Sequence, residues 1–404
     1  RTTSNAYKVT DMTATDIAKK DNVDALVEPT LTCYGDMVCL QVRVITPYPE
    51  EKVIWVGDFM EDKSQILNLY NRIISDVTHE LKVNLTLQEE TLLAESRNID
   101  PDAYDAYLKG LSNLGMFSPE SWSVAIESFE KAIEIEPVWA APYAGLAEVG
   151  TYMNQISFGT ESDRIRMIYE NLTKALELDP NSAEAHHSNA VTAAWIEFDW
   201  KKAEKEFLKA IELNPSYARS HSFYAHLLMI LRRTDVALYE GKLSVELDPE
   251  DSFTLGLYVD VLWRTGRCQE ALFYVEKGLS IDPDHPFLLT KLLPVYECLG
   301  DYEKAFEEWK KINYDRWTTL TELLEEVFYK RGLNAFKQEL ARIYEETMGN
   351  EIQVTHWFLI DLYLNLGKYD KLMDYFEIIY EDNNRNPNLP YISTKVVYDK
   401  MKGN

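Results

Sequence analysis

The segment AIELNP, at residues 210–215, is one of five in this 404-residue chain in which an apolar and acidic run ends in proline. The other four are AIEIEP at 132–137, ALELDP at 175–180, SVELDP at 244–249 and LSIDP at 279–283, so successive prolines lie 43, 35, 34 and 34 residues apart. A period near 34 with a helix-ending proline in each unit is typical of an array of helical hairpins. Each hairpin in such an array buries its apolar face only against its neighbours.

A second spacing recurs upstream of each proline: a small residue twelve positions before it, an apolar or aromatic one eight before it and a small one five before it. Ala203, Phe207 and Ala210, which precede Pro215, are the best example. These offsets place the three residues on one helix face, where small side chains let neighbouring helices approach and the aromatic ring fills the gap. The pattern predicts the packing face of the second helix in each hairpin.

The first helix of each hairpin is expected to end at a glycine followed by a turn residue, as at Gly266-Arg267, Gly300-Asp301 and Gly367-Lys368, because glycine suits a left-handed helix end. The stretch LGDYEKA at 299–305 resembles the turn signature of the tetratricopeptide repeat (TPR) family almost unmodified. The resemblance covers residues 102–312 in register. It implies a mainly α fold, a TPR α-solenoid whose inner helices line a concave face.

We therefore assign residues 98–313 to the TPR array and 314–404 to divergent helical repeats with a C-terminal cap. In the divergent part we expect two helices around Arg331-Gly332 and one last hairpin around Gly367. No strand is expected between Asp102 and Ile312. The insertion at 155–163, which accounts for the longest proline interval, should form a loop inside the second hairpin.

Residues 1–97 differ in kind and read as a small α+β domain. Segments 23–33 and 37–46 alternate apolar and polar residues around Gly35-Asp36, which predicts a tight hairpin. This turn pairs Cys33 with Val38, Leu31 with Leu40 and Val27 with Val44, all on one buried face. Cys39 then points to the opposite face, so a disulfide between Cys33 and Cys39 is not expected. A strand at 52–59 and helices at 13–20 and 65–81 complete the domain.

The amino-terminal region also resembles the second half of the FlgO-like (TolB amino-terminal-like) domain. The resemblance rests on the segments RTTS at 1–4, VDALVE at 23–28, QVRV at 41–44, DAY at 102–104 and YLKG at 107–110. In bacteria this domain followed by a repeat array commonly forms the extracytoplasmic half of one-pass membrane proteins. The other half of such proteins is a transcriptional regulator, adenylate cyclase or kinase in the cytoplasm. The family's domain opens with a further strand and helix, so we expect this chain to be a fragment.

Composition excludes several classes of function. The formal net charge of −26 and the pI near 4.7 argue against contact with nucleic acid phosphates or anionic lipid through this region. No stretch approaches the roughly 20 apolar residues that cross a bilayer, so contact with a membrane would need an absent tether. The four cysteines indicate neither a disulfide scaffold nor a zinc site. No catalytic, metal or cofactor motif occurs, and we predict neither enzyme activity nor a cofactor.

The concave face is the remaining candidate for function. Apolar side chains beside a few charges are typical of peptide-binding surfaces. The positions that would line this face are Tyr152, Thr192, Trp195, His226, Met229, Phe253, Asp260, Trp263, Arg264 and Glu297. An equally weighted alternative is that Trp195 and Trp263 only pack under the turn of their own hairpin.

These features predict a non-catalytic module that binds a protein or peptide, with an acidic charge that favours a neutral or basic partner. The resemblance implies that it is the periplasmic or extracytoplasmic sensor part of an inner-membrane bacterial signalling protein. A homodimer is compatible with this interpretation. The alternatives are a free-standing cytoplasmic TPR scaffold and, with less support, an enzyme with its site between the two domains.

Overall fold

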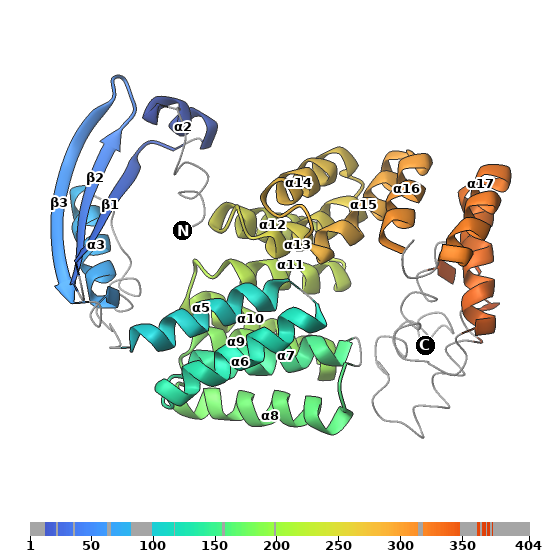
Figure 1. Cartoon of the computed structure of the whole chain (residues 1–404), viewed down its shortest axis with the longest axis horizontal. Helices are drawn as coiled ribbons and strands as arrows, with labels where there is room; N and C mark the ends of the chain where they lie inside the picture. Colours follow the sequence, from blue (N-terminus) through green and yellow to red (C-terminus); the bar gives the residue numbers. More distant parts are fainter. Residues whose placement is uncertain are drawn as a thin grey trace. The chain divides into compact units, whose positions relative to one another are not determined.

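The computed structural model describes residues 13–21, 23–34, 37–62, 66–81, 99–116, 118–155, 158–197, 199–313 and 318–347, with 362–363, 366–368, 370–371 and 374. The amino-terminal elements are α2 (Ala14–Asp21), β1 (Leu26–Tyr34), β2 (Met37–Thr46), β3 (Lys52–Asp62) and α3 (Ile66–Glu80). They are followed by α5 (Pro101–Gly115), α6 (Pro119–Ile135), α7 (Ala140–Gln155), α8 (Glu161–Leu178), α9 (Ala183–Thr192), the π-helical turn η2 (Ala193–Glu197), α10 (Trp200–Leu213), α11 (Ala218–Ile230), α12 (Thr234–Leu247), α13 (Ser252–Arg264), α14 (Cys268–Ile281), α15 (Pro286–Leu299), α16 (Tyr302–Asn313) and α17 (Thr318–Thr347) (Figure 1).

The chain divides into two compact units. The first contains Arg1–Gly110 and Glu127–Pro142, and the second contains Leu111–Ile126 and Tyr143–Asn404. The division passes through α5 and α6, the first helical pair. The predicted domain boundaries at 97/98 and 313/314 both touch residues outside the described ranges, as does the predicted cap after residue 381.

The sheet of the first unit has strand order β1-β2-β3, and both pairs are antiparallel. The predicted hairpin register is confirmed, since Val27 pairs with Val44, Leu31 with Leu40 and Thr32 with Cys39. Cys39 is a free thiol, as expected. The prediction of one continuous buried face is wrong on β1, where the side chains of Val27 and Leu31 are 48% and 61% exposed.

The reason lies in the position of α3, which packs against β2 and β3 (Figure 1). Leu69, Ile73 and Val77 of this helix form a core with the inward side chains of β2 and with Phe59 of β3. β1 is an edge strand beyond the cover of α3, so Val27 and Leu31 stay exposed.

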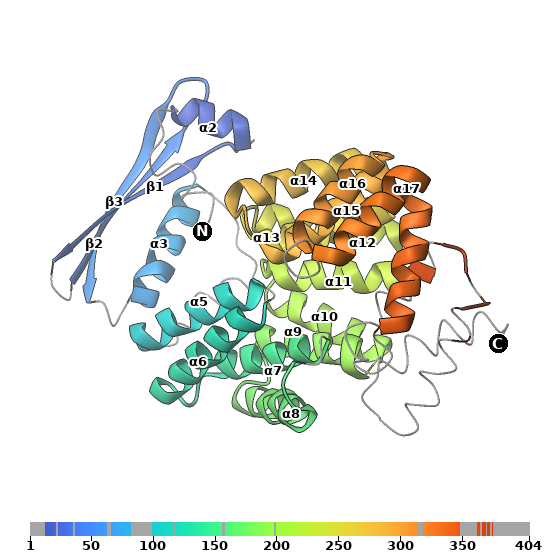
Figure 2. The ribbon, with the colours of Figure 1, turned by 45° about the vertical axis from the view of Figure 1, so that its right-hand side comes forward.

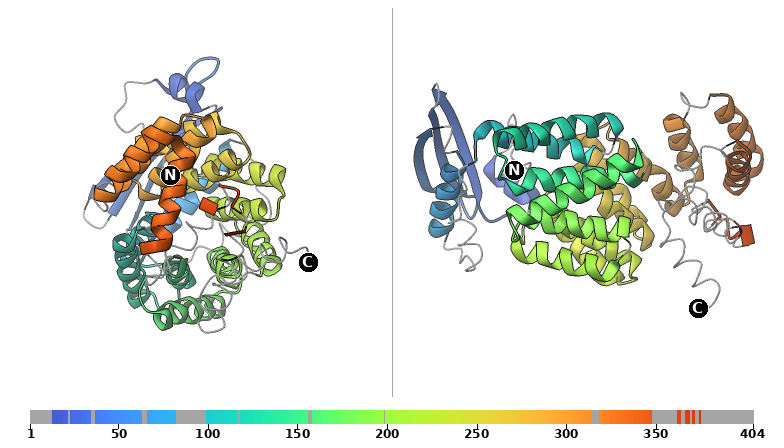
Figure 3. Two further views of the ribbon diagram at one scale, coloured as in Figure 1. Left: turned by 90° about the vertical axis from the view of Figure 1, so that its right-hand side faces the viewer. Right: turned by 90° about the horizontal axis from the view of Figure 1, so that it is seen from below.

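The array is built from antiparallel helix pairs, and the described residues between Pro101 and Asn313 contain no strand, as predicted. The pairs α11/α12, α13/α14 and α15/α16 follow one another, and the first helices of successive pairs contact each other (Figure 2). Within the second unit the helices follow a curved path, visible end-on in the left view of Figure 3. The fold is a mainly α, TPR-type solenoid with a small α+β domain before it.

The small-aromatic-small pattern does the packing that the sequence predicts. Ala203, Phe207 and Ala210 are completely buried on α10. At Gly241, which takes the place of Phe207 one repeat later, an added Cβ would lie 2.6 Å from the ring of Tyr258. A tyrosine of the next first helix therefore fills the space that the missing aromatic residue leaves.

The turns between paired helices use left-handed backbone as predicted, with φ of +79° at Gly266, +77° at Gly300 and +63° at Gly367. Arg232, one period before Gly266, adopts the same conformation with φ of 59°. Gly332, with φ of 79° and ψ of 179°, breaks α17 where two helices were expected.

Two departures from the 34-residue period have different structural outcomes. The predicted loop at 155–163 is wrong at its ends, because α7 runs to Gln155 and α8 begins at Glu161. The extra residues mostly lengthen α7 and α8 to 16 and 18 residues, against 13 and 14 in α11 and α12. The single extra residue of the 35-residue interval coincides with η2, a π-helical turn of the kind that absorbs one residue and often marks functional sites.

Candidate functional site

The first helices of the array pack together around a core of aromatic rings. They therefore do not line an open groove along their whole length. The ring centroid of Tyr152 lies 6.2 Å from that of Phe223 and 6.0 Å from that of Phe253, and these last two rings are 5.8 Å apart. Tyr152 and Thr192 are fully buried, and Phe253 is 2% exposed. The prediction that these three residues line an accessible surface is therefore wrong, because successive first helices converge on them.

A buried ionic group lies beside this core and was not predicted. Glu148 of α7 accepts hydrogen bonds from the Tyr152 hydroxyl and, at 2.7 Å, from Nη2 of Arg219 on α11. Nε2 of His187 on α9 is 3.6 Å from the same Glu148 oxygen. Burial by itself would raise the pKa of Glu148, but Arg219 and His187 hold it well below its ordinary value. This set, which we call the Glu148–Arg219 cluster, links three successive hairpins.

Five residues near the C-terminal ends of α9, α11 and α13 remain accessible, and we call them the Trp195–Trp263 surface. Trp195, His226, Met229 and Trp263 are half-buried, and Arg264 is exposed. Trp195 lies in the middle of η2, where it stacks on His226 at 6.1 Å and packs edge-on against Phe223 at 5.4 Å. It also lies 6.3 Å from Phe207 of its own hairpin. Packing thus holds the indole in place and leaves part of it exposed.

Asp260 supports this surface from below, since it is 6% exposed and holds two partners. One carboxylate oxygen accepts a hydrogen bond from Nε1 of Trp263 at 2.9 Å, and the other accepts one from Nζ of Lys291 at 2.6 Å. Burial would raise the pKa of Asp260, but Lys291, His226 and Arg264 lower it, so the group stays ionised. Burial also lowers the pKa of His226 to about 4, which keeps this imidazole neutral at neutral pH.

Arg264 and Glu297 each have polar side-chain atoms without a hydrogen-bond partner among the described residues. The Arg264 guanidinium lies 4.4 Å from the Trp263 ring, and no carboxylate of the described residues lies within 4.0 Å of it. Glu297 accepts a hydrogen bond at 2.7 Å from Nζ of Lys337, a residue of α17 that sequence reasoning missed because the repeat register ends before it. The other oxygen of Glu297, Oε1, is buried and has no hydrogen-bond partner among the described residues.

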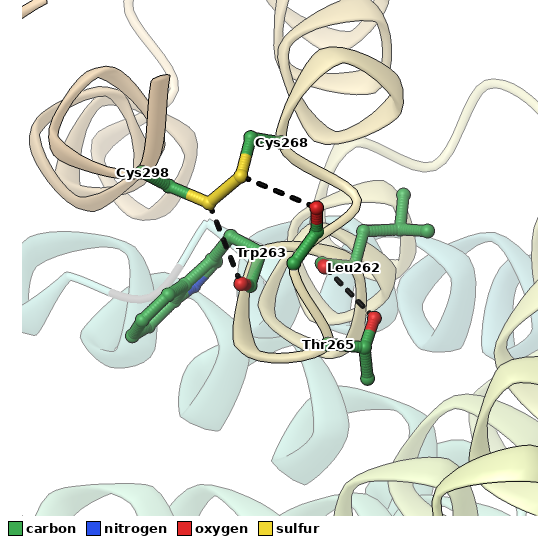
Figure 4. The surroundings of a disulfide bond; sticks show 6 residues. Leu262, Trp263, Thr265, Cys268 and Cys298 are labelled. Carbon is green, nitrogen blue, oxygen red and sulfur yellow. Dashed lines mark hydrogen bonds between the residues drawn. A yellow bond between two sulfur atoms is a disulfide. The ribbon is translucent and has the colours of Figure 1, made fainter. Parts of the chain in front are cut away.

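A disulfide joins Cys268, the first residue of α14, to Cys298 in the last turn of α15 (Figure 4). Sγ of Cys298 lies 3.6 Å from the backbone carbonyl oxygen of Trp263. Sequence reasoning excluded a disulfide scaffold and a Cys33–Cys39 pair, and it missed this single bridge. The sequence contained a signal, because the start of a second helix lies beside the end of the next first helix in an array of antiparallel hairpins.

The described residues contain no group of three or more His, Cys, Asp or Glu side chains that could hold a metal ion. Among them, no helix has the length and apolar character needed to span a membrane.

Comparisons with known proteins give only distant similarities. No protein-family model matches the chain. A Rhizobium meliloti protein provisionally named adenylate cyclase 3 is 22% identical over 145 residues, or 35% of this chain and 24% of that protein. The chain thus matches about a quarter of the length of this curated relative.

Similar solved structures include TPR proteins of low identity. Thermus thermophilus TTC0263 is 16% identical, with a TM-score of 0.37 over 49% of this chain and 98% of that one. Yeast Tom70 is 18% identical, with a TM-score of 0.40 over 76% of this chain and 66% of that one. The human IFIT1 dimer is 16% identical, with a TM-score of 0.44 over 84% and 79%.

Proposed function

We propose that this chain is a non-catalytic recognition module that binds an extended peptide or protein segment across the Trp195–Trp263 surface. The observation that carries the proposal is the run of half-buried Trp195, Met229 and Trp263 on three successive hairpins, next to the exposed Arg264. Binding energy at protein interfaces concentrates in a few Trp, Tyr and Arg anchors. Here the anchors are fixed in place before a partner arrives, which lowers the entropy lost on binding.

The chemistry of the surface defines the partner. The indoles and the Met229 thioether would pack on apolar side chains, while the Arg264 guanidinium would donate hydrogen bonds to carbonyl oxygens of an extended backbone. With its net charge of −26, the chain as a whole favours a neutral or basic partner. Nothing at this surface resembles a nucleophile paired with a general base, which supports binding rather than catalysis.

We also propose that the module works outside the cytoplasm, as part of a membrane-anchored bacterial signalling protein. The Cys268–Cys298 disulfide supports this location, because disulfides persist in oxidising compartments such as the bacterial periplasm and are rare in the cytosol. The relative from Rhizobium meliloti carries the name of an adenylate cyclase, one of the effector classes expected from the amino-terminal resemblance.

A peptide-display selection on the immobilised wild-type chain tests the binding proposal. We expect selected peptides to lose about tenfold or more in affinity for the Trp195→Ala, Trp263→Ala double variant, since losing an anchor costs roughly 2 kcal/mol. The matched control is Tyr239→Ala, Phe273→Ala, which removes two aromatic rings exposed at 65% and 60% on the second helices α12 and α14. If the control variant loses binding and the tryptophan variant retains it, recognition belongs to the second-helix face.

A further inference from the structure

We propose that Cys268 and Cys298 form a thiol–disulfide exchange site that controls the conformation of the Trp263 end of the Trp195–Trp263 surface and, through it, the affinity for the proposed peptide ligand. The part of this inference that concerns peptide affinity rests on the proposed function. The control of conformation can be tested without a ligand.

The first observation is where the bond lies. Cys268 belongs to one hairpin and Cys298 to the first helix of the next, with Cα atoms 5.7 Å apart and a sequence separation of 30. The bond therefore adds a covalent link between two repeats that are also joined by packing and by the Lys291–Asp260 ion pair. Cys298 lies exactly one 34-residue period after Arg264, so the bridge occupies a position equivalent to one in the surface itself.

The second observation is what the bond touches. Sγ of Cys298 is 3.6 Å from the Trp263 carbonyl oxygen, and Sγ of Cys268 is 3.4 Å from that of Gly266. Gly266 donates its backbone N–H to the same Trp263 carbonyl at 3.1 Å and has the left-handed φ of +79°. The disulfide thus fastens α15 onto the turn that follows α13, beside Trp263 (Figure 4).

The third observation is the set of contacts that depends on this placement. Lys291 and Glu297 both belong to α15, and Lys291 bonds to the Asp260 carboxylate that holds the Trp263 indole. A shift of α15 away from α13 would break the hydrogen bond from Lys291 and leave the Asp260 carboxylate, which accepts the Trp263 indole N–H, without its cation. The position of the indole is therefore linked to the bridge through the backbone of its own residue and through Asp260.

Both cysteines are half-buried, so a reductant can reach them. The reactant we name is a dithiol, either a small molecule or a dithiol oxidoreductase. One thiolate of the dithiol attacks one sulfur of the bridge, the S–S bond breaks, and the other sulfur leaves as a thiolate that takes up a proton. The second thiol of the reductant then displaces the first cysteine as a thiol. Two electrons pass to the chain, and the reductant is left as a disulfide.

Hydrogen exchange of the full chain, oxidised and after reduction with dithiothreitol, gives the ligand-free test. We expect faster exchange on reduction at 263–268 and 294–300, and no change at the Trp195 end of α9 or in the first unit. Cys268→Ser and Cys298→Ser should each exchange like the reduced chain, while Cys39→Ser should respond to dithiothreitol as the wild type does. Unchanged exchange at both segments on reduction would overturn the proposal.

Affinity for a display-selected peptide gives the second readout. We expect it to fall about fivefold or more in the reduced chain and in both serine variants, a typical size for coupling between two sites. Equal affinity in the oxidised and reduced states would overturn the control of binding. If no peptide binds either state, the proposed function fails, and the hydrogen-exchange comparison still decides whether the bridge controls the surface.

Discussion

The Glu148–Arg219 cluster and the Trp195–Trp263 surface are built from similar side chains but differ in how accessible these are to solvent. Each has aromatic rings and an arginine on the first helices, yet Arg219 is half-buried and pairs with Glu148, whereas Arg264 is exposed and lies against the Trp263 ring. Where the first helices converge, water is excluded and every charge must have a partner. At the C-terminal ends of these helices, the charged groups and rings remain partly accessible to solvent. The comparison teaches that similar side chains on the first helices become core or contact surface according to how closely neighbouring helices approach.

The largest expected effect separates the two arginines. Arg219→Met should lower the free energy of unfolding by about 3–5 kcal/mol, because it leaves the Glu148 carboxylate buried without its cation. Arg264→Met, the control of the same residue type, should change it by less than about 0.5 kcal/mol. Urea denaturation of the two variants measures the difference. Adding Glu148→Gln to Arg219→Met should restore part of the loss, and a failure to do so would show that the charge is not the cause.

Phe207 lies beneath both regions, with its ring centroid 5.9 Å from that of His187 and 6.3 Å from that of Trp195. Phe207→Ala should therefore cost about 3–5 kcal/mol, as truncations of buried aromatic residues do. The neighbouring Leu208, which is 48% exposed, provides the control Leu208→Ala. Thermal denaturation compares them, and equal midpoints would contradict the assigned packing face.

The disulfide lies beside the Trp195–Trp263 surface and is not part of the Glu148–Arg219 cluster. We expect its removal to lower the free energy of unfolding by an intermediate amount. Replacing Cys268 and Cys298 together by serine should lower stability by about 2–4 kcal/mol, since the cross-link restricts the unfolded chain. Cys39→Ser is the control, because Cys39 is a free thiol in the sheet. Denaturant midpoints measured without reductant check this, and adding reductant should bring the wild type down to the double variant.

Local and periodic features of the fold were predictable from the sequence, while features that depend on the curvature of the array were not. The hairpin register at Cys33–Val38 and the left-handed turn at Gly300 follow from neighbouring residues. The burial of Tyr152 and Phe253 depends on how four successive hairpins converge, which no single repeat encodes. Lys337 was missed for a related reason, because it reaches Glu297 from a helix outside the repeat register.

The smallest expected effect concerns His226 of the Trp195–Trp263 surface. Burial lowers the pKa of its imidazole to about 4 from an ordinary value of 6.5. The unfolded state then binds more protons than the folded state between these two values, so stability must fall as the pH drops through this window. The His226→Gln variant cannot take up that proton. Between about pH 7 and pH 5 its free energy of unfolding should therefore fall by about 1–2 kcal/mol less than that of the wild type. Urea midpoints across this range measure both slopes. If His226→Gln follows the wild-type curve, the imidazole is as well solvated in the folded chain as in the unfolded one, and the boundary between core and contact surface lies below His226 rather than at it.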